Sequence, residues 1–417
     1  MTIAEHTGQA AMQPVESYLS DVLAAIRPVP PRELRLDEAG GGVLTEDVTA
    51  AWPLPPFDNS GMDGFAVLAA DVAAATPEQP VTLPVSGEVP AGDTARHDLA
   101  PGTCMRIMTG APLPSGADAV VPVEWTDADR ADTRRRVTIR RPAEPGNAIR
   151  RTGGDAVPGD LLLAAGTRLG PVQLALLAAA GRGTVTARPK PRLTVMSTGN
   201  ELIEPGQPVT PGQIWESNSR MLAAAAQQAG CLARRHPIVP DDKAAVLAAI
   251  EDALADTDLL VTTGGVSMGG EHDVVKAALH DLGTVTFRKI AMQPGMPQGF
   301  GVVGPASTPI FTLPGNPVSA YVSFQLFVRP AVGVLQGIDP ERLAADRATL
   351  AAPVRSPAGR RSYLRGVLDS SAGTVAPVSG QSSHQLAALA RANALIVVPD
   401  SVTELPEGAD VDVLVLP

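Results

Sequence analysis

The chain is poor in cysteine and in aromatic residues. It has two cysteines, Cys104 and Cys231, in 417 residues. Two cysteines cannot build a disulfide framework or a cysteine-based zinc site, and we therefore expect a cytoplasmic protein. Aromatic residues make up only 3% of the chain, so its cores must be built largely from alanine, valine and leucine.

Basic residues are also scarce, since 33 lysines and arginines face 44 aspartates and glutamates. No basic run is dense enough to follow a phosphate backbone, which argues against a nucleic-acid partner. Residues 1–14 are polar, and no apolar run approaches the length that spans a bilayer. We therefore expect no membrane association.

The length and the alternating pattern predict a multidomain protein of α/β and β parts. One hydrophobic core does not serve 417 residues, so three or four domains are expected. Strand-like and helix-like runs alternate over 190–335, which predicts a doubly wound, mostly parallel sheet. The expected domains are an extended helical linker domain over 1–55 and 149–188, an inserted β-domain over 56–148, the central α/β domain over 189–338 and a β-barrel-like domain over 345–417.

Three glycine-rich segments are present within about sixty residues, at 262–270, 293–297 and 313–319. Two of them follow strand-like runs, so their backbone N–H groups should line one edge of the sheet, where phosphates bind. Asn316 is a candidate N-cap, and Pro317 suits the first position of the helix that follows. The alternative is a pair of ordinary strand-to-helix turns. The candidate ligand-binding residues are Gly264, Gly265, Ser267, Pro314, Gly315, Asn316 and Ser319.

Acidic residues also occur in turn-rich segments outside the central domain. Asp63 lies in the segment 56–67, where an acid can bind a metal, orient a polar ring or make an Asx-turn, and spacing alone favours the turn. Thr109 is expected at a strand-to-loop corner. Asp155 follows two arginines, and a surface salt bridge is the alternative interpretation there.

Five motifs, in this order, resemble those of the molybdopterin molybdotransferase (MoeA) family, which includes the gephyrin E domain. They are the segments 57–64, 106–112, 197–202, 263–267 and 313–319, and the likeness extends over about 15–416. The resemblance implies a homodimer of elongated subunits, in which the central domain of one subunit faces the inserted β-domain of the other. It implies a reaction that takes adenylylated molybdopterin and molybdate, uses Mg²⁺, and releases molybdenum cofactor and AMP.

The resemblance also implies roles for individual residues. Asp241 and Asp273 are similar to the family's metal-binding acids, with Glu201 close by, and the metal would act as a Lewis acid. Arg365 and Ser383 match positions that line the molybdate pocket. The implied catalytic residues are Asp63, Thr109, Asp155, Glu201 and Lys289, the first three reaching the site from the partner subunit.

The chain departs from the family pattern beside the expected oxyanion pocket. Members commonly have Lys-Pro-Gly-Lys-Pro there, whereas this chain has Gln293 and Met296 in place of the two lysines. Losing two positive charges should weaken the capture of a dianion unless other groups compensate. Asn200 also replaces a common acid, which removes one candidate metal ligand.

Two alternatives to the transferase remain at this stage. A weakly catalytic or non-catalytic pterin-binding scaffold is compatible with the same fold, although the many retained acids favour turnover. A pterin-adenylylating enzyme would leave the β-domains unexplained. A molybdopterin adenylyltransferase and molybdoenzyme assembly proteins are the expected partners.

Overall fold

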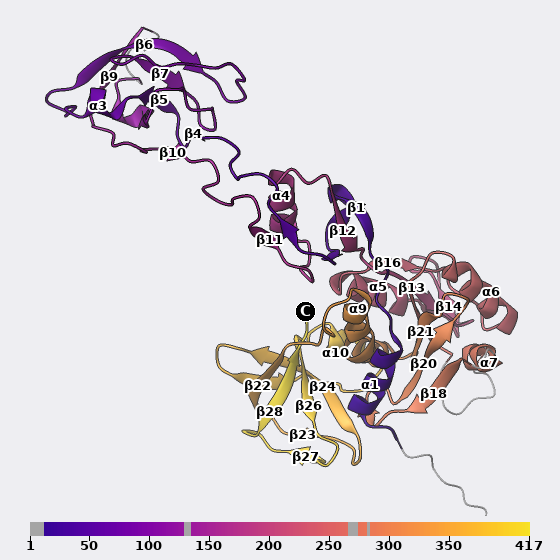
Figure 1. Cartoon of the computed structure of the whole chain (residues 1–417). Helices are drawn as coiled ribbons and strands as arrows, with labels where there is room; N and C mark the ends of the chain where they lie inside the picture. Colours follow the sequence, from indigo (N-terminus) through magenta and orange to yellow (C-terminus); the bar gives the residue numbers. More distant parts are fainter. Residues whose placement is uncertain (1–11, 129–134, 266–273, 282–283) are drawn as a thin grey trace, which may run out of the picture. The chain divides into compact units, whose positions relative to one another are not determined.

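The computed structural model describes residues 12–128, 135–265, 274–281 and 284–417, and it contains two compact units (Figure 1). The first unit contains Gly41–Thr45 and Thr186–Pro417 together with the start of the chain up to Leu34. The second contains Arg35–Gly40 and Glu46–Val185.

The centre of the first unit is a six-stranded sheet with the order β16-β13-β17-β21-β20-β18. The first four strands are parallel to one another, and β20 pairs antiparallel with both β21 and β18. The expected mostly parallel sheet is therefore confirmed, with an antiparallel end. The strands are β13 (Arg192–Ser197), β16 (Leu232–Arg235), β17 (Leu259–Thr263), β18 (Val285–Lys289), β20 (Pro297–Val303) and β21 (Thr308–Leu313).

Helices cover both faces of this sheet because successive strand residues point to opposite sides. Leu259 and Val261 belong to the core under α1, α5 and the helix after β21, whereas Leu260 belongs to the core under α6 and α7. The sheet is thus doubly wound, as expected. The helices are α1 (Val15–Ala25), α5 (Asn218–Gln228), α6 (Lys243–Leu254), α7 (Val274–Asp281), α8 (Pro317–Ser323), the π-helical segment η2 (Phe324–Val328) and α9 (Arg329–Leu335).

Among the described helices, the continuous one from Pro317 to Leu335 is long and apolar enough to cross a membrane. Its most apolar window is 78% buried inside the protein. Phe324, Phe327 and Val332 lie in the same core as the central strands. The helix is therefore a core helix of the α/β domain.

The C-terminal part of the first unit is a closed five-stranded barrel, which confirms the β-barrel-like prediction. The strand order is β24-β25-β22-β28-β26, and pairing of β24 with β26 closes the ring. The short β19 (Met292–Gln293) of the α/β domain adds to β24 in parallel. The barrel strands are β22 (Ala345–Leu350), β24 (Arg361–Asp369), β25 (Thr374–Pro377), β26 (Ala394–Val398) and β28 (Asp410–Val415), accompanied by β23 (Val354–Arg355), β27 (Glu404–Leu405) and α10 (Leu386–Leu389).

The second unit contains a five-stranded sheet with the order β8-β5-β7-β6-β9. All five strands lie within the expected inserted β-domain: β5 (Gly64–Val67), β6 (Val81–Val89), β7 (Cys104–Ile107), β8 (Ala119–Pro122) and β9 (Arg136–Ile139). The linker part of this unit has β3 (Val48–Thr49) paired with β11 (Leu161–Leu163), β4 (Asn59–Ser60) paired with β10 (Ile149–Arg150), and α4 (Pro171–Ala179).

Candidate functional site

Two glycine loops meet at the carboxyl edge of the central sheet. One follows β17 at Gly264 and Gly265, and the other follows β21 at Pro314, Gly315 and Asn316. A Cβ atom added to Gly315 would lie 3.5 Å from the Cα atom of Gly264, so the two backbones are in contact. Gly264 and Gly265 have φ angles of 96° and 63°, a conformation that side chains disfavour. Glycine is therefore required at the place where an anion could approach the backbone.

Asn218, the first residue of α5, ties the two loops together. Its Nδ2 group donates to the carbonyl oxygen of Gly315 at 2.7 Å and to the Thr263 hydroxyl at 3.0 Å. The Thr263 hydroxyl in turn donates to the carbonyl oxygen of Pro314 at 3.1 Å. Sequence reasoning did not single out Asn218 as a site residue, because its two partners lie far along the chain.

The start of α5 is itself held by a buried carboxylate, Glu216, which is 1% exposed. Its Oε1 atom accepts from the Ser219 amide at 2.6 Å and from the Ser197 hydroxyl at 2.8 Å. Its Oε2 atom accepts from the Ser219 hydroxyl at 2.7 Å, and Arg220 Nη1 lies 3.2 Å away. A buried charge with this many donors is compensated, so Glu216 fixes α5 against the end of β13.

A cavity of about 320 Å³, here called the edge cavity, opens beside these loops. Its lining has a polar part and an apolar part. The polar part includes Thr198, Asn218, Gly264, Gly315 and Asn316, and the apolar part Leu202, Ile214 and Trp215. The Thr198 hydroxyl is buried and has no hydrogen-bond partner among the described residues.

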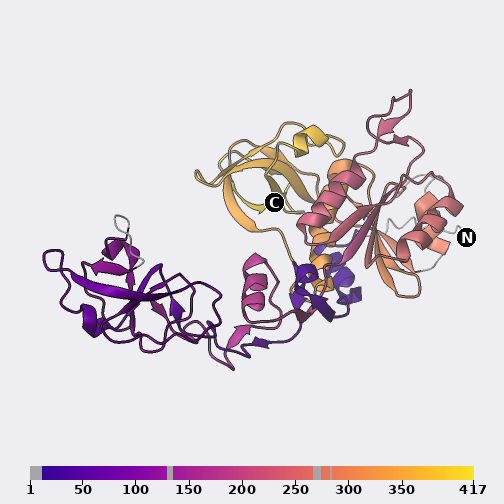
Figure 2. The ribbon, with the colours of Figure 1, turned by 90° about the horizontal axis from the view of Figure 1, so that it is seen from above.

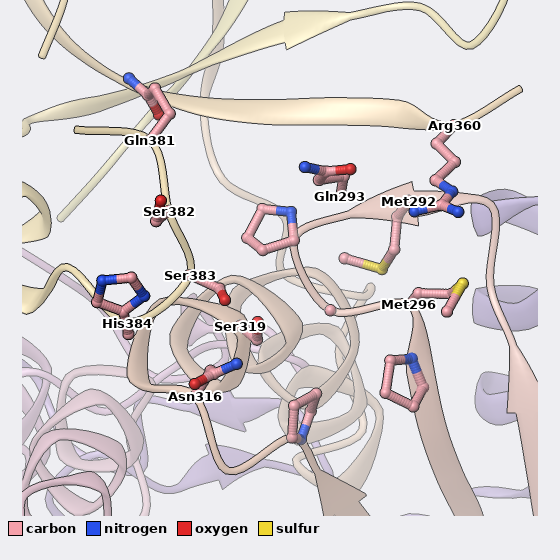
Figure 3. A pocket seen from close by; sticks show the side chains of 14 residues that line it. Met292, Gln293, Met296, Asn316, Ser319, Arg360, Gln381, Ser382, Ser383 and His384 are labelled. Carbon is pink, nitrogen blue, oxygen red and sulfur yellow. The ribbon is translucent and has the colours of Figure 1, made fainter. Parts of the chain in front are cut away.

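A second cavity of about 530 Å³, here called the barrel-side cavity, lies between the α/β domain and the C-terminal barrel. Figure 3 shows Ser319, Ser382, Ser383, His384, Gln293 and Arg360 around it. Asn316 and His384 line both cavities, so the two adjoin at these residues. One extended ligand could therefore occupy both.

The structure places one of the two predicted molybdate residues on the wall of the barrel-side cavity. Ser383 lines it, whereas Arg365 does not. Arg365 is fully buried, and its Nη2 group donates to the carbonyl oxygens of Gly380 and Ser382. Burial lowers the pKa of Arg365. Arg365 thus supports the loop that carries the cavity wall, and the cation on the wall is Arg360, which sequence reasoning missed.

The candidate N-cap Asn316 occupies the expected position, but its side chain makes no capping hydrogen bond. The Val318 amide in the first turn instead donates to the carbonyl oxygen of Ser383 at 3.1 Å. Pro317 is the first residue of the helix, as expected, and Ser319 is buried against the barrel-side cavity. Part of this helix N-terminus therefore binds the barrel domain, while Asn316 itself faces both cavities.

The predicted metal ligands are only partly described. Asp241 accepts from the Asn200 amide at 3.2 Å, and the Asn200 side chain accepts from the Asp241 amide at 3.0 Å. Glu201, next to Asn200 in sequence, lines the edge cavity. Asp273 and Ser267 lie outside the described residues. Within the described ranges, no group of three His, Cys, Asp or Glu side chains is placed to hold a metal ion.

Lys289 is half-buried at the end of β18. In the antiparallel ladder it stands opposite Pro297, which lines the barrel-side cavity. Its own side chain is not among those that line either cavity. The structure therefore brings Lys289 to the neighbourhood of the site but not to its wall.

In the second unit the structure joins Asp63 to Thr109. One Asp63 oxygen accepts from the Thr109 amide at 2.6 Å and from its hydroxyl at 2.7 Å. The hydrogen bond from the amide, followed by that from the hydroxyl, holds the pKa of Asp63 below its usual value. Asp155 is exposed, and its carboxylate has no partner among the described residues. Arg151 forms its salt bridge with Asp58 at 2.7 Å, and not with Asp155 as in the alternative interpretation.

Comparison with known proteins shows the class of protein. Its three consecutive regions match domain families of molybdopterin biosynthesis proteins. Residues 13–181 match the MoeA N-terminal region (domain I and II), 194–333 a probable molybdopterin binding domain, and 347–416 the MoeA C-terminal region (domain IV). A MoeA crystal structure from Pyrococcus horikoshii superposes with a TM-score of 0.72 at 33% identity, covering 97% of this chain and 99% of that one.

Curated relatives give the particular family. The chain is 45% identical over 410 residues to molybdopterin molybdenumtransferase 2 of Mycobacterium tuberculosis, which covers 97% of this chain and 98% of the relative. It is 37% identical to the molybdopterin molybdenumtransferase of Bacillus subtilis, covering 89% and 87%. The chain belongs to the MoeA family of molybdopterin molybdenumtransferases, enzymes of molybdenum cofactor biosynthesis. The family resemblance seen in the sequence is confirmed.

Proposed function

We propose that this protein inserts molybdate into adenylylated molybdopterin and releases molybdenum cofactor and AMP. One observation carries the proposal: two cavities, each with polar lining residues, adjoin at Asn316 and His384. One lies at glycine loops suited to phosphate, and the other is lined by hydroxyl groups and a guanidinium. A substrate with a phosphate link and an oxyanion co-substrate require two such neighbouring sites.

The edge cavity is the proposed site of the phosphate link. Among the described residues, the amides of Gly315 and Asn316 have no hydrogen-bond acceptor. Both residues are exposed at the edge of the sheet. Free amides beside a glycine loop bind phosphate oxygens well. The Asn218 bridge holds this loop in place before the substrate arrives.

The barrel-side cavity is the proposed site of molybdate. Ser382 and Ser383 can donate to an oxyanion, and Arg360 supplies a positive charge to the lining of the same cavity. Gln293 and Met296 line the cavity where the family commonly has lysines. The oxyanion would therefore be held by hydrogen bonds and one guanidinium, with less positive charge than in the lysine-containing pattern.

Magnesium fits the acids near the edge cavity. Asp241 and Glu201 would supply two carboxylates, the predicted ligand Asp273 would supply a third, and substrate oxygens would complete the coordination that Mg²⁺ prefers. When bound, the cation would withdraw charge from the phosphoryl oxygens. The chain's own residues hold the diphosphate in place while an oxygen of water or molybdate attacks the adenylyl phosphorus. The P–O bond to the pterin phosphate breaks, the pterin keeps its phosphate, and AMP leaves with the attacking oxygen. Where that oxygen comes from molybdate, its Mo–O bond breaks as well and the metal passes to the pterin.

The remaining expectations belong to the same proposal. Asp63, Thr109 and Asp155 would complete the site from the second unit of the partner subunit in a homodimer. Lys289 would counter phosphate charge from the end of β18. We propose a cytoplasmic location, a molybdopterin adenylyltransferase as the supplier of substrate and a molybdoenzyme assembly protein as the acceptor of product.

Release of AMP tests the function directly. We expect the full chain to release AMP from adenylylated molybdopterin when Mg²⁺ and molybdate are present. Asp241→Asn should reduce turnover and raise the Mg²⁺ concentration needed, because an amide is a weaker ligand than a carboxylate. The control Asp252→Asn changes a carboxylate that is 81% exposed and should have no effect. Absence of AMP above a no-enzyme blank would support the alternative, a pterin-binding scaffold.

A further inference from the structure

Trp215 forms an exposed aromatic wall of the edge cavity. It lies in β15 (Ile214–Trp215), which pairs in parallel with β14 (Leu202–Ile203). The segment that holds both strands projects from the α/β domain (Figure 2). Trp215 is 52% exposed although the chain has only three tryptophans. A large exposed aromatic side chain beside a cavity is an unusual placement in so aromatic-poor a protein.

The indole ring is held in one orientation. Its Nε1–H group donates to the carbonyl oxygen of Gln207 at 2.8 Å. On either side of Trp215 the backbone is fixed, since the Ile214 amide donates to Glu201 and the Glu216 amide donates to Ile203, both at 2.8 Å. Because the polar atom of the indole already has a partner, the flat face of the ring is the part left for a ligand.

The lining of the same cavity also includes polar groups, one of which is unpaired within the described part of the chain. Thr198, which lines the cavity, is 3% exposed, and its hydroxyl has no partner among the described residues. Buried hydroxyl groups are nearly always hydrogen-bonded, so a bound molecule is the expected partner. Gly264 and Gly315 line the same cavity. The cavity thus combines an anion-binding end with an aromatic face.

We propose that Trp215 stacks on a fused-ring heterocycle whose phosphate binds at the glycine loops. A purine and a pterin share this chemistry, and the proposed substrate carries both. The inference therefore deepens the proposed function and rests on it for the identity of the ligand. Stacking on an aromatic side chain makes Trp215 a residue that selects the ring and leaves the chemical step to other groups.

Binding measurements on the full chain separate the ring from the phosphate. The probes are AMP, a pterin that carries a phosphate monoester, and ribose 5-phosphate, which has no heterocycle. We expect the ring-bearing probe that occupies the cavity to quench tryptophan fluorescence, whereas ribose 5-phosphate should not. Trp215→Leu should reduce the affinity for that probe about tenfold or more and leave the affinity for ribose 5-phosphate unchanged. Trp215→Phe should restore most of the affinity.

A matched control is Trp52→Leu, which changes a tryptophan that is 70% exposed in the second unit. It should leave ring binding and its quenching intact. Loss of affinity for AMP alone identifies the purine as the stacked ring, and loss for the pterin alone identifies the pterin. If Trp215→Leu binds both ring-bearing probes as the unmodified chain does, the stacking proposal is wrong.

The outcome for catalysis distinguishes this inference from the proposed function. In turnover, Trp215→Leu should raise KM for adenylylated molybdopterin with little change in kcat, because stacking binds the ground state and the transition state alike. Normal turnover with unchanged KM would overturn the role of Trp215 and leave the transferase function standing. Trp215-dependent ring binding without any AMP release would support the stacking role of Trp215 and contradict the transferase function.

Discussion

The carbonyl oxygen of Ser383 accepts a hydrogen bond from the Val318 amide at 3.1 Å. This contact joins a loop of the C-terminal barrel to the first turn of α8 in the α/β domain. It satisfies a helix amide that has no partner within the helix. It also holds the backbone of Ser383, whose side chain lines the barrel-side cavity (Figure 3).

Ser383→Ala should weaken molybdate binding without disturbing this link, because the contact to Val318 uses the backbone. Losing one hydrogen bond to a charged group costs about 1.5–3 kcal/mol, or roughly ten- to a hundredfold in affinity. The measurement is the molybdate concentration that gives half-maximal AMP release. Ser401→Ala, an exposed change in the same domain, serves as the control. An unchanged molybdate requirement would show that the Ser383 hydroxyl does not bind the oxyanion.

Gln293→Lys should lower the molybdate concentration needed. Gln293 is exposed on the wall of the barrel-side cavity, so a lysine there adds a cation without burying it. One added charge beside a dianion in a solvated cavity is worth on the order of 1 kcal/mol, or about fivefold in affinity. The gain should shrink as salt is added. Gln227→Lys adds the same charge on α5, away from this cavity, and an equal gain there would point to a general charge effect.

Glu216→Gln should loosen the start of α5. The amide keeps one acceptor for Ser219 and Ser197 but places an N–H group where Glu216 Oε2 accepts from the Ser219 hydroxyl. Leaving a buried group unsatisfied costs about 1–3 kcal/mol. We expect the variant to show faster hydrogen exchange over Asn218–Gln228 and a lower thermal midpoint than the unmodified chain.

Glu204→Gln is the matched control for Glu216→Gln. Glu204 pairs with Arg220 at 2.6 Å and Arg235 at 3.0 Å, but its side chain is 45% exposed. Such a pair is worth less than about 1 kcal/mol. We therefore expect only a small change. Equal effects of the two substitutions would contradict the inference that Glu216 fixes the start of α5.

The periodic parts of the fold could be predicted from the sequence. The alternation of strand-like and helix-like runs predicted over 190–335 is present in the structure, for example in the strand Arg192–Ser197 and the helix Lys243–Leu254. The glycine loops at the sheet edge were also predictable, since few residues besides glycine adopt the observed conformation of Gly264. Helices, strands and glycine turns can be predicted from local patterns because residues close together in the sequence determine these structures.

Contacts between distant residues could not be predicted in this way. Glu216, Trp215 and Arg360 are single residues without periodicity, and their roles depend on groups far along the chain. Arg365 was predicted from the family match to line the molybdate pocket. The match could not indicate that the side chain is buried behind the cavity wall. The π-helical segment Phe324–Val328 likewise interrupts a helix that reads as continuous in sequence.

Thr109→Val tests the link to Asp63 in the second unit. Valine keeps the shape and the backbone amide but removes one of the two donors to the Asp63 carboxylate. The folded-state pKa of Asp63 lies below its usual value, so the contact stabilises the fold above the unfolded-state pKa and is lost as pH falls through the folded-state pKa. The variant should therefore show a higher Asp63 pKa in a carboxyl NMR titration. Its stability deficit at neutral pH should vanish in acid.

Thr152→Val separates this structural effect from catalysis. Asp58 accepts from the Thr152 amide at 2.7 Å and its hydroxyl at 2.8 Å, which reproduces the arrangement of Asp63 and Thr109 outside the predicted site. Hydrogen bonds from Thr152 and Arg151 likewise hold the pKa of Asp58 below its usual value. Both valine variants should thus lose a little stability at neutral pH, but only Thr109→Val should slow AMP release. Equal turnover in the two variants would remove Thr109 from the catalytic set and leave the Asp63 contact as a turn-stabilising feature.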